Sequence, residues 1–276
     1  MTQRFKDKTA IITGASSGIG AAAARQFIIE GANVALIARN KDNLDKIVAQ
    51  TGSEKAIAIS ADVTDLDKMS AVLQQVKKHF GAIHILVNNA GFNSRGPIDT
   101  RPLDEVLQIV DLNLRSPIAL TRLVLPLIKE AGAGAVVNVA SLAGRYPLPD
   151  EATYSATKFG LRAFTYALAE ENRGTGVTVS VVSPGPVDTG FIMEDIDEVP
   201  DLVFSQPMSS PEQVAAAILD CAYGGKVERA LPRLSGYLAT AGYLFPGLQR
   251  KLRPILKRKG RKNKLRYKAR AADAGS

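Results

Sequence analysis

Tyr154 and Lys158 form the clearest candidate for a catalytic pair in the sequence. They stand four positions apart in a segment with helical periodicity, so their side chains share one face of the predicted helix. A phenol has a reference pKa of about 10, which is too high for ready proton exchange at neutral pH. The Lys158 ammonium would stabilise the phenolate and lower that pKa. The pair is therefore suited to move a proton to or from a substrate oxygen.

A glycine-rich turn earlier in the chain is the second chemical feature. It reads TGASSGIG over residues 13–20 and lies between a predicted strand and a predicted helix. Glycines let the backbone approach a pyrophosphate closely, and the N–H groups at a helix start attract its charge. The spacing G-x-x-x-G-x-G fits the general G-x-G-x-x-G fingerprint only loosely, so a plain tight turn stays the alternative. The candidate ligands in this turn are Gly14, Ser16, Ser17, Gly18, Ile19 and Gly20.

Short apolar runs alternate with helical segments along most of the chain. The runs are nearly continuous in hydrophobicity, which is typical of strands that are covered on both faces. This alternation predicts an α/β fold with a doubly wound parallel sheet in a single domain over residues 1–232. The predicted strands are 8–13, 33–38, 56–60, 83–88, 135–140 and 177–183, and the predicted helices include 21–30, 66–80 and 153–172.

The periodicity stops between residues 190 and 210, where apolar residues are mixed with acids and prolines. A long apolar loop in a compact domain is usually a lid or a binding segment, although it can also pack simply on the core. Ser210, Pro211 and Gln213 then provide an N-cap, a proline at the first helical position and a capping-box partner. They predict that a helix begins there.

Taken in order, these motifs resemble the short-chain dehydrogenase/reductase family over roughly residues 5–232. The resemblance implies a Rossmann fold without a separate substrate domain, and a nicotinamide cofactor that supplies the hydride. The positive charge of the oxidised nicotinamide would add to that of Lys158 in lowering the pKa of Tyr154. The motifs are Thr13-Gly14-x-x-x-Gly18-Ile19-Gly20, Asp62-Val63, Asn88-Asn89-Ala90-Gly91, Asn113, Ser141, Tyr154-x-x-x-Lys158 and Pro184-Gly185-x-Val187-x-Thr189.

The same resemblance implies roles for single residues. Asn113, Ser141, Tyr154 and Lys158 are the expected catalytic residues: Ser141 polarises the substrate oxygen and Asn113 holds a water near the lysine. Tyr154 and Lys158 also contact the cofactor. Asp62 and Val63 bind the adenine, and Thr189 binds the carboxamide. The remaining expected cofactor contacts are Asn89, Ala90, Gly91, Pro184, Gly185 and Val187. Asn89 can equally be structural and bridge neighbouring strands.

The end of the second predicted strand bears on the choice of cofactor. NAD-preferring relatives have an acidic residue there, whereas this chain has Ala38 followed by Arg39 and Asn40. A missing carboxylate removes repulsion of a 2′-phosphate, and a guanidinium provides a planar fork that matches it. Asn40 can add a hydrogen bond. The sequence thus favours NADP(H) over NAD(H).

Composition excludes several other classes. A single cysteine, Cys221, rules out a disulfide framework, and only two histidines, His79 and His84, argue against a metal site or a Ser-His-Asp hydrolase. The first eight residues are charged and lack an apolar run, so no signal peptide is expected. We therefore expect a metal-free protein of a reducing compartment, cytoplasmic and in part peripheral on the inner face of a membrane.

The C-terminal extension, residues 233–276, has a different character. Residues 249–276 carry a net charge of +11 and the rest of the chain −3. Leu244, Leu248, Leu252 and Leu256 recur every four residues among basic side chains, a pattern typical of an interfacial helix on anionic lipid. Prolines 246 and 254 predict two short helices rather than one, and part of the extension is expected to be disordered. A helix over the substrate pocket and nonspecific nucleic-acid binding are the alternatives; no motif indicates specific nucleic-acid recognition.

The sequence as a whole predicts an NADP(H)-dependent oxidoreductase that interconverts a carbonyl and an alcohol. The apolar residues of segment 190–208 suggest a hydrophobic substrate such as a lipid, steroid, retinoid or long-chain acyl derivative. The pocket should be bounded by 91–97, 142–149 and 190–208. A 3-oxoacyl-carrier-protein reductase and a non-catalytic NADP(H)-binding sensor are the alternatives. By resemblance, helices in 102–131 and 153–172 would form a homodimer or homotetramer.

Overall fold

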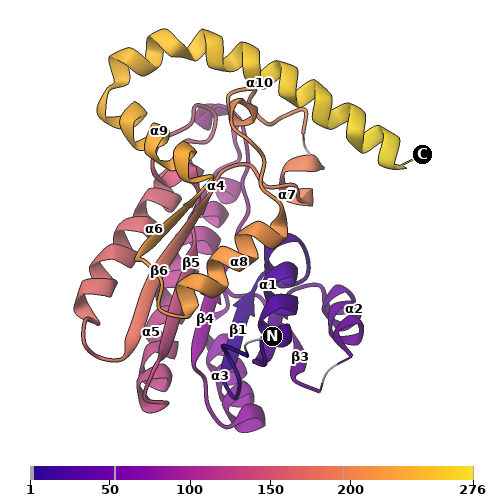
Figure 1. Cartoon of the computed structure of the whole chain (residues 1–276), viewed down its shortest axis with the longest axis vertical. Helices are drawn as coiled ribbons and strands as arrows, with labels where there is room; N and C mark the ends of the chain where they lie inside the picture. The colour runs from indigo at the N-terminus through magenta and orange to yellow at the C-terminus, as the bar shows by residue number, and fades with distance from the viewer. Residues whose placement is uncertain (1–2, 53, 195, 276) are drawn as a thin grey trace.

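Seven parallel strands form one sheet at the centre of the molecule, in the order β3-β2-β1-β4-β5-β6-β7 (Figure 1). A computed structural model describes residues 3–52, 54–194 and 196–275, with the backbone alone at 248 and 271–275. The strands are β1 (Thr9–Thr13), β2 (Asn33–Ala38), β3 (Ala56–Ser60), β4 (Ile85–Asn88), β5 (Gly134–Val139), β6 (Val177–Pro184) and β7 (Glu228–Leu231). The predicted α/β fold of Rossmann type is confirmed.

Helices cover both faces of the sheet, as a parallel sheet requires. One buried cluster joins α1, α2 and α8 to the sheet, and a second joins α3, α5 and α6 to its other face. The helices are α1 (Gly18–Ile29), α2 (Lys41–Thr51), α3 (Leu66–Phe80), α4 (Leu103–Val110), α5 (Ser116–Glu130), α6 (Ala152–Glu171), α7 (Gly190–Met193), α8 (Pro211–Ala222), α9 (Arg233–Leu244) and α10 (Pro246–Gly275). Short turns of helix are η1 (Ile98–Thr100), η2 (Asp111–Arg115), η3 (Leu142–Gly144) and η4 (Val203–Ser205).

The predicted elements agree with these bounds to within three residues. β2, β3 and α3 begin and end where the sequence pattern places them. The predicted capping box is present at the start of α8, where Ser210 accepts from the Gln213 N–H and the Gln213 side chain accepts from the Ser210 N–H. β7 was not predicted, because its four residues include two charged ones and show no strand-like apolar run.

A pair of buried amides joins β4 to β5. Asn88 and Asn138 are register partners, and the Asn88 side chain donates to the Asn138 side-chain oxygen at 2.8 Å. Asn88 also donates to Thr121 on α5, and Asn138 donates to Thr165 on α6. The four side chains are buried, so these bonds fix two strands and two helices relative to one another.

The part of the C-terminal extension that the structure describes is mostly helical. α9 ends at Leu244 and α10 begins at Pro246, but α10 then continues through Pro254. The prediction that Pro254 also interrupts the helix is therefore wrong. Pro254 is exposed, so water can reach the carbonyl that its missing N–H leaves unpaired. Within the described residues, no helix combines the length and hydrophobicity needed to cross a bilayer.

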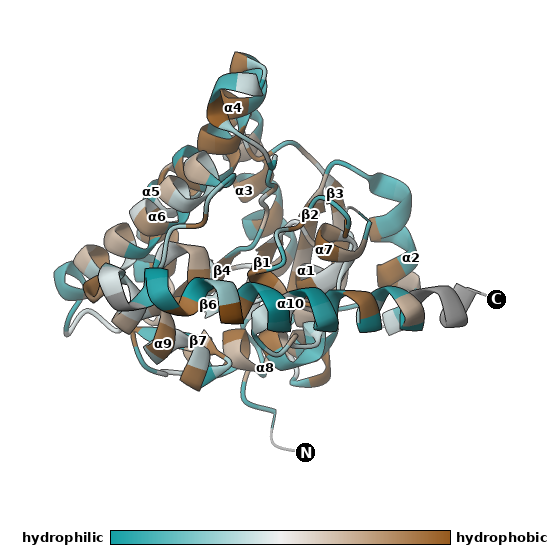
Figure 2. Ribbon diagram, turned by 90° about the horizontal axis from the view of Figure 1, so that it is seen from above, coloured by the Kyte–Doolittle hydropathy of each residue, from teal (hydrophilic) through white to brown (hydrophobic). Residues whose placement is uncertain are grey.

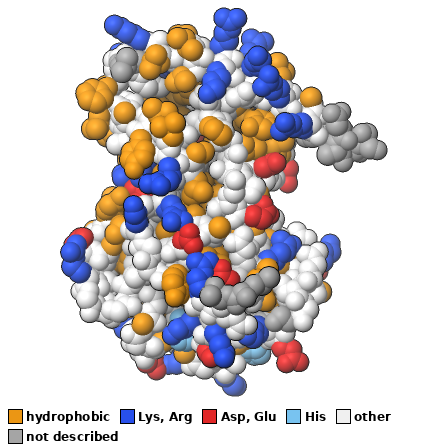
Figure 3. Space-filling model, in the orientation of Figure 1, with side chains coloured by type: hydrophobic (Ala, Val, Ile, Leu, Met, Phe, Trp, Pro, Cys, Tyr) orange, Lys and Arg blue, Asp and Glu red, His pale blue; other side chains and the backbone are white. Residues whose placement is uncertain are grey.

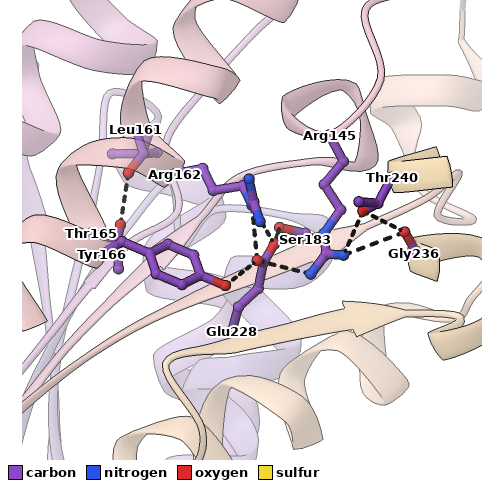
Figure 4. Close-up of polar contacts among 9 residues, drawn as sticks. All are labelled: Arg145, Leu161, Arg162, Thr165, Tyr166, Ser183, Glu228, Gly236 and Thr240. Carbon is purple, nitrogen blue, oxygen red and sulfur yellow. Dashed lines mark hydrogen bonds and ion pairs between the residues drawn. The ribbon is translucent and has the colours of Figure 1, made fainter. Parts of the chain in front are cut away.

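Glu228 attaches the extension to the body of the molecule (Figure 4). Its buried carboxylate, on β7, accepts from Arg145 at 2.8 Å, from Arg162 at 2.8 Å and from the Tyr166 hydroxyl at 2.7 Å. Arg145 in turn donates to the Gly236 carbonyl and the Thr240 hydroxyl on α9. Burial raises the pKa of Glu228, but these donors outweigh it, so the pKa lies below its ordinary value.

Replacing Glu228 with glutamine should lower the free energy of unfolding by about 2 to 3 kcal/mol, because two guanidinium groups lose their counter-charge. Urea denaturation at neutral pH measures this loss. Glu170→Gln is the matched control, because Glu170 pairs with Arg173 in full solvent and its loss should leave the midpoint unchanged. Equal midpoints for Glu228→Gln and the wild-type chain would contradict the role of Glu228.

Candidate functional site

A cavity of about 1160 Å³ lies at the carboxyl ends of the strands, beneath α9 and α10. Its lining includes residues from all three segments that were predicted to bound the pocket, among them Phe92, Leu148 and Phe191. α9 and α10 also line it, which corresponds to the alternative that the extension covers the pocket. The cavity is continuous from the glycine-rich turn to the predicted catalytic residues.

The glycine-rich turn brings backbone close to backbone. Gly14 has a φ of +64°, and an added Cβ there would lie 2.8 Å from the Cα of Ala90. At Gly20 an added Cβ would lie 2.3 Å from the Gly14 carbonyl oxygen, so only glycine fits both positions. Ser17 is the N-cap of α1 but makes no side-chain capping bond, so it leaves the first N–H groups of the helix free of a side-chain cap. This geometry suits an anion.

Asn89 has a structural role in the glycine-rich turn. Its side chain donates to the carbonyl oxygens of Thr13 and Gly14, at 3.0 and 3.2 Å, and its N–H donates to the Thr13 hydroxyl. These bonds tie the end of β4 to the glycine-rich turn after β1. Asn89 also lines the cavity, so a structural role and a contact with a ligand are compatible.

The residues after β2 and β3 line the same end of the cavity. Arg39 is exposed there, and its carbonyl accepts from the Ser60 hydroxyl at 3.0 Å. The Asn40 side-chain oxygen accepts from the Asn43 N–H and so caps α2. Asp62 is held by the Thr64 N–H and hydroxyl. Burial raises the pKa of Asp62, yet these bonds and the nearby cations outweigh it, so its pKa lies below the ordinary value.

The remaining predicted cofactor contacts also line the cavity. They are Val63, Ala90, Gly91, Pro184, Gly185, Val187 and Thr189, and Ser16, Gly18 and Ile19 line the phosphate end. Gly20 supports the turn from behind, because it is buried and is not part of the lining. Of the predicted catalytic residues, Ser141, Tyr154 and Lys158 reach the cavity wall, whereas Asn113 is fully buried behind it.

Ser141, Tyr154 and Lys158 come together between β5 and α6. Ser141 follows β5 and hydrogen-bonds the Tyr154 hydroxyl. The Lys158 ammonium lies 5.6 Å from the centre of the Tyr154 ring and donates to the Val139 carbonyl at 3.0 Å. α6 can approach β5 this closely because Gly144 packs on the Lys158 backbone, where an added Cβ would lie 2.6 Å from the carbonyl oxygen.

Burial sets the protonation of both groups. It lowers the pKa of Lys158 to about 8. Burial and the charge of Glu151 raise the pKa of Tyr154, while the Ser141 hydrogen bond and the charge of Arg95 lower it by less. The chain's own groups therefore raise the pKa of Tyr154, because desolvation of the phenolate exceeds the nearby positive charge. Tyr154 consequently keeps its proton at neutral pH. The expected lowering also relied on the charge of the oxidised nicotinamide and stays a prediction.

The Asn113 side chain holds the turn after β4. Its oxygen accepts from the Phe92 N–H at 3.0 Å and its amide donates to the Phe92 carbonyl at 2.8 Å. Asn113 lies in η2, a π-helical turn, which leaves a wider backbone opening than an α-helix. Phe92 therefore engages both the oxygen and the nitrogen of the Asn113 side chain, and the expected role of Asn113 in holding a water near Lys158 stays a prediction.

Sequence reasoning missed a buried ion pair in the cavity wall. Arg95 and Glu151, each at most 6% exposed in the side chain, are joined by an Arg95 Nε to Glu151 oxygen contact of 3.3 Å. The Arg95 guanidinium also lies over the Phe191 ring, 5.6 Å from its centre, and that ring lies 6.2 Å from the Tyr154 ring. The pair therefore connects the catalytic helix to the lid segment. In the sequence, the only sign of this pair was that Arg95 follows the Asn88–Gly91 motif and Glu151 precedes the Tyr154–Lys158 motif.

α10 crosses over α7 and the segment that follows it (Figures 1 and 2), and residues of this segment line the cavity. Lys264 donates to the carbonyls of Asp197 and Val199 at 2.9 and 2.8 Å, and Asn263 donates to the Phe204 carbonyl at 3.0 Å. Ile192, Val199 and Phe204 form a small apolar cluster against which Tyr267 packs. The segment is therefore a lid with its own core, and one face of α10 completes it.

The low pKa of Lys158 predicts a pH-dependent stability. Its pKa is about 8 in the folded chain and 10.5 in an unfolded one, so below pH 8 both states carry the proton and burial of the charge destabilises the fold. Between pH 8 and 10.5 the unfolded state binds more protons, so stability rises with pH, by up to about 3 kcal/mol. Urea denaturation across this range should show the rise for the wild-type chain and not for Lys158→Met. If stability changed with pH in the same way in both chains, the lowered pKa of Lys158 would be contradicted.

Comparisons with known proteins agree with this geometry. The family model described as short chain dehydrogenase matches residues 8–199. The chain is 39% identical over 215 residues to the ketoacyl reductase HetN of Nostoc sp., covering 77% of this chain and 74% of that protein. It is 36% identical to an uncharacterized oxidoreductase of Staphylococcus epidermidis, over 67% of this chain and 80% of the relative.

Solved structures give the same result. A short-chain dehydrogenase from Streptomyces avermitilis superimposes with a TM-score of 0.76 at 32% identity, covering 90% of this chain and 95% of its own. A short-chain dehydrogenase/reductase of unknown function from Caenorhabditis elegans, solved with a cofactor, gives a TM-score of 0.74 at 30% identity, covering 82% and 95%. A nicotinamide dinucleotide is typical of such enzymes. On its sequence, its sheet and its cavity, this chain belongs to the short-chain dehydrogenase/reductase family of oxidoreductases.

Proposed function

We propose that this protein is an NADP(H)-dependent oxidoreductase that reduces a carbonyl on an apolar substrate, and oxidises the alcohol in reverse. One observation carries the proposal. Ser141, Tyr154 and Lys158 line the same continuous cavity as the glycine-rich turn and Arg39. A dinucleotide that is held at its phosphates by the turn would therefore extend toward the proton donor.

The residues present fit the dinucleotide. The glycine-rich turn presents backbone N–H groups at the start of α1 that no side chain caps. Its glycines have no Cβ atoms that would take up the space beside these N–H groups. Asp62 lines the cavity and would accept from the adenine, and Thr189 lines it as well and would bind the carboxamide. The bound cofactor would supply the hydride, and the protein supplies position and electrostatics.

Tyr154 is the proposed proton donor to the carbonyl oxygen. Its raised pKa keeps the hydroxyl protonated, and the Ser141 hydroxyl beside it can donate to the same oxygen. Lys158, with a pKa of about 8, carries a positive charge at neutral pH that would stabilise the phenolate once the proton has left. These roles favour reduction, because a protonated phenol is ready to donate.

The cavity walls favour an apolar substrate. The lid, η3 with the loop after it, and the extension contribute many hydrophobic side chains to the lining, beside polar ones such as Gln206, Gln249 and Lys259. The hydrophobic side chains include Leu142, Leu148, Phe191, Ile192, Val199, Leu202, Leu234, Leu238 and Leu256. A long acyl chain, a steroid or a retinoid would bury its surface there.

A 3-oxoacyl thioester is the best-supported alternative substrate. The relative HetN, at 39% identity, is named a ketoacyl reductase, and the exposed Lys259 of α10 borders the cavity, where it would attract an acidic carrier. Turnover of a carrier-bound 3-oxoacyl group, without turnover of free long-chain ketones, would select it. A non-catalytic NADP(H) sensor is disfavoured, because binding alone needs no proton donor beside a buried lysine.

We also propose that the chain forms a homodimer or homotetramer through α4, α5 and α6. α4 and the start of α5 expose large apolar side chains, which are normally covered in an assembly. Leu103 is 69% exposed, and Leu107, Val110 and Ile118 are also exposed.

Replacing Tyr154 with phenylalanine should lower the turnover number about 10²- to 10⁴-fold, because only the proton donor is removed. Affinity for NADPH should stay within a few-fold of wild type. NADPH oxidation with ketones and aldehydes of increasing chain length measures the first quantity, and fluorescence titration of NADPH measures the second. Tyr146→Phe, which removes a hydroxyl from the same cavity, is the control and should keep its turnover. Retained turnover in Tyr154→Phe would remove this residue from the mechanism.

Replacing Arg39 with aspartate should shift the cofactor preference toward NADH. The ratio of kcat/KM for NADPH to that for NADH should fall about 10- to 100-fold, since a charge-assisted contact is lost and repulsion is added. Steady-state kinetics with both cofactors measure the ratio. Arg25→Asp changes an exposed arginine outside the cavity and should leave the ratio as it is. An unchanged ratio in Arg39→Asp would contradict a phosphate contact.

A further inference from the structure

α10 has two faces with different roles. Its inner face packs on the lid: an added Cβ at Gly260 would lie 1.7 Å from the Asp201 carbonyl oxygen, and Asn263, Lys264 and Tyr267 also contact the lid. Residues 251, 255, 258, 262 and 265 follow one another at helical spacing on the opposite side and are all exposed. The outer face is thus free of contacts within the described chain.

This outer face mixes cations with apolar side chains. Ile255 and Leu265 are 67% and 62% exposed, and Lys251, Arg258 and Lys262 surround them. Among the described residues these three cations have no ion pair or hydrogen bond, and residues 250–270 contain no acid. The side chain of Leu248, part of the predicted stripe, lies outside the described residues. Leu256 of that stripe lines the cavity, whereas Leu244 and Leu252 of the same stripe are exposed.

α9 continues the surface with a cluster of apolar side chains, which Figure 3 shows beside the cations of α10. Each side chain in the cluster exposes more than half of its surface, far more than isolated exposure on a soluble domain would explain. The cluster consists of Leu234, Tyr237, Leu238, Tyr243, Leu244 and Phe245.

The cavity opens at this cluster. Leu234 and Leu238 line the cavity and are also 68% and 63% exposed, so the apolar surface and the pocket wall are continuous there. Gln249, Leu256 and Lys259 extend the rim onto α10. An apolar molecule can therefore pass from whatever covers α9 into the cavity without crossing water.

We propose that the cluster on α9 and the outer face of α10 dock on an anionic membrane surface and place the cavity mouth against the lipid. Cations without partners complement anionic headgroups, and exposed aromatic and aliphatic side chains suit the boundary between headgroups and acyl chains. The docking itself stands independently of the proposed function; only the statement that an apolar substrate enters from the membrane rests on it.

Vesicle co-sedimentation of the full-length protein tests the docking. The protein should bind vesicles of phosphatidylglycerol and phosphatidylcholine in equal parts, bind pure phosphatidylcholine vesicles weakly, and lose most of its binding at high salt. The variant Lys251→Glu/Arg258→Glu/Lys262→Glu should bind the anionic vesicles at least about tenfold more weakly. Circular dichroism confirms that α10 stays helical in the variant.

Lys6→Glu/Lys46→Glu/Lys78→Glu is the matched control. It makes the same change in net charge at exposed lysines on the segment before β1, on α2 and on α3, which lie away from α10 (Figure 1). It should bind anionic vesicles like the wild type. Equal loss in both triple variants, or no binding by the wild-type chain, would overturn the proposal.

Ile255→Ser/Leu265→Ser distinguishes lipid from other polyanions and from a second copy of the chain. It should weaken vesicle binding while it leaves binding to duplex RNA and the sedimentation coefficient unchanged. If RNA binds more tightly than anionic vesicles, or if the variant instead reduces the mass of the assembly, the membrane is not the partner.

An activity measurement separates this proposal from the proposed function. The Lys251→Glu/Arg258→Glu/Lys262→Glu variant should reduce a short water-soluble ketone at the wild-type rate but a vesicle-embedded long-chain aldehyde several-fold more slowly. Equal rates on the embedded aldehyde would contradict delivery from the membrane. Absence of turnover on every carbonyl, together with intact vesicle binding, would overturn the proposed function and leave the docking surface standing.

Discussion

The pairing of β4 with β5 is the constraint on which the candidate site depends. Asn88 and Asn138 hydrogen-bond each other across these strands inside the core, where an unpaired amide would cost about 1–3 kcal/mol. A slip of register would break that bond and turn side chains to the wrong face. Residues 89–91 follow β4 directly, and residues 140 and 141 follow β5. The same bond therefore sets how far the turn at Gly91 lies from Ser141.

Burial then gives the site its chemistry. Gly144 lets α6 approach the end of β5, so Lys158 and Tyr154 lie away from water and their ionised forms lose hydration. The pKa of Lys158 falls to about 8 and that of Tyr154 rises, which leaves a neutral acid beside a cation. A surface pair with the same spacing would have neither property, because water would solvate both charges.

The extension belongs to the cavity and is not an appendage. Glu228 binds Arg145, which holds α9, and α10 holds the lid through Lys264 and Asn263. The basic side chains of α10 therefore fall into two groups. Lys264 and Lys268 on the inner face of α10 contact the lid, and Lys251, Arg258 and Lys262 on the outer face have no ion pair among the described residues. Net charge alone did not distinguish the two groups.

The sequence was enough to predict the alternation of strands and helices and the fold class, because hydrophobic periodicity and turn residues act locally. The resemblance to the family supplied the motifs from Gly14 to Thr189, and most of their residues line the cavity. The sequence did not reveal the Arg95–Glu151 pair, the burial of Glu228 on β7 or the continuity of α10 through Pro254. Those depend on which neighbours surround a side chain. Arg95 and Glu151 are 56 positions apart in the chain, and Ser183, which donates to the buried Glu228 carboxylate, is 45 positions away from it. Only the tertiary structure decided them, since desolvation and charge pairing arise where distant segments pack together.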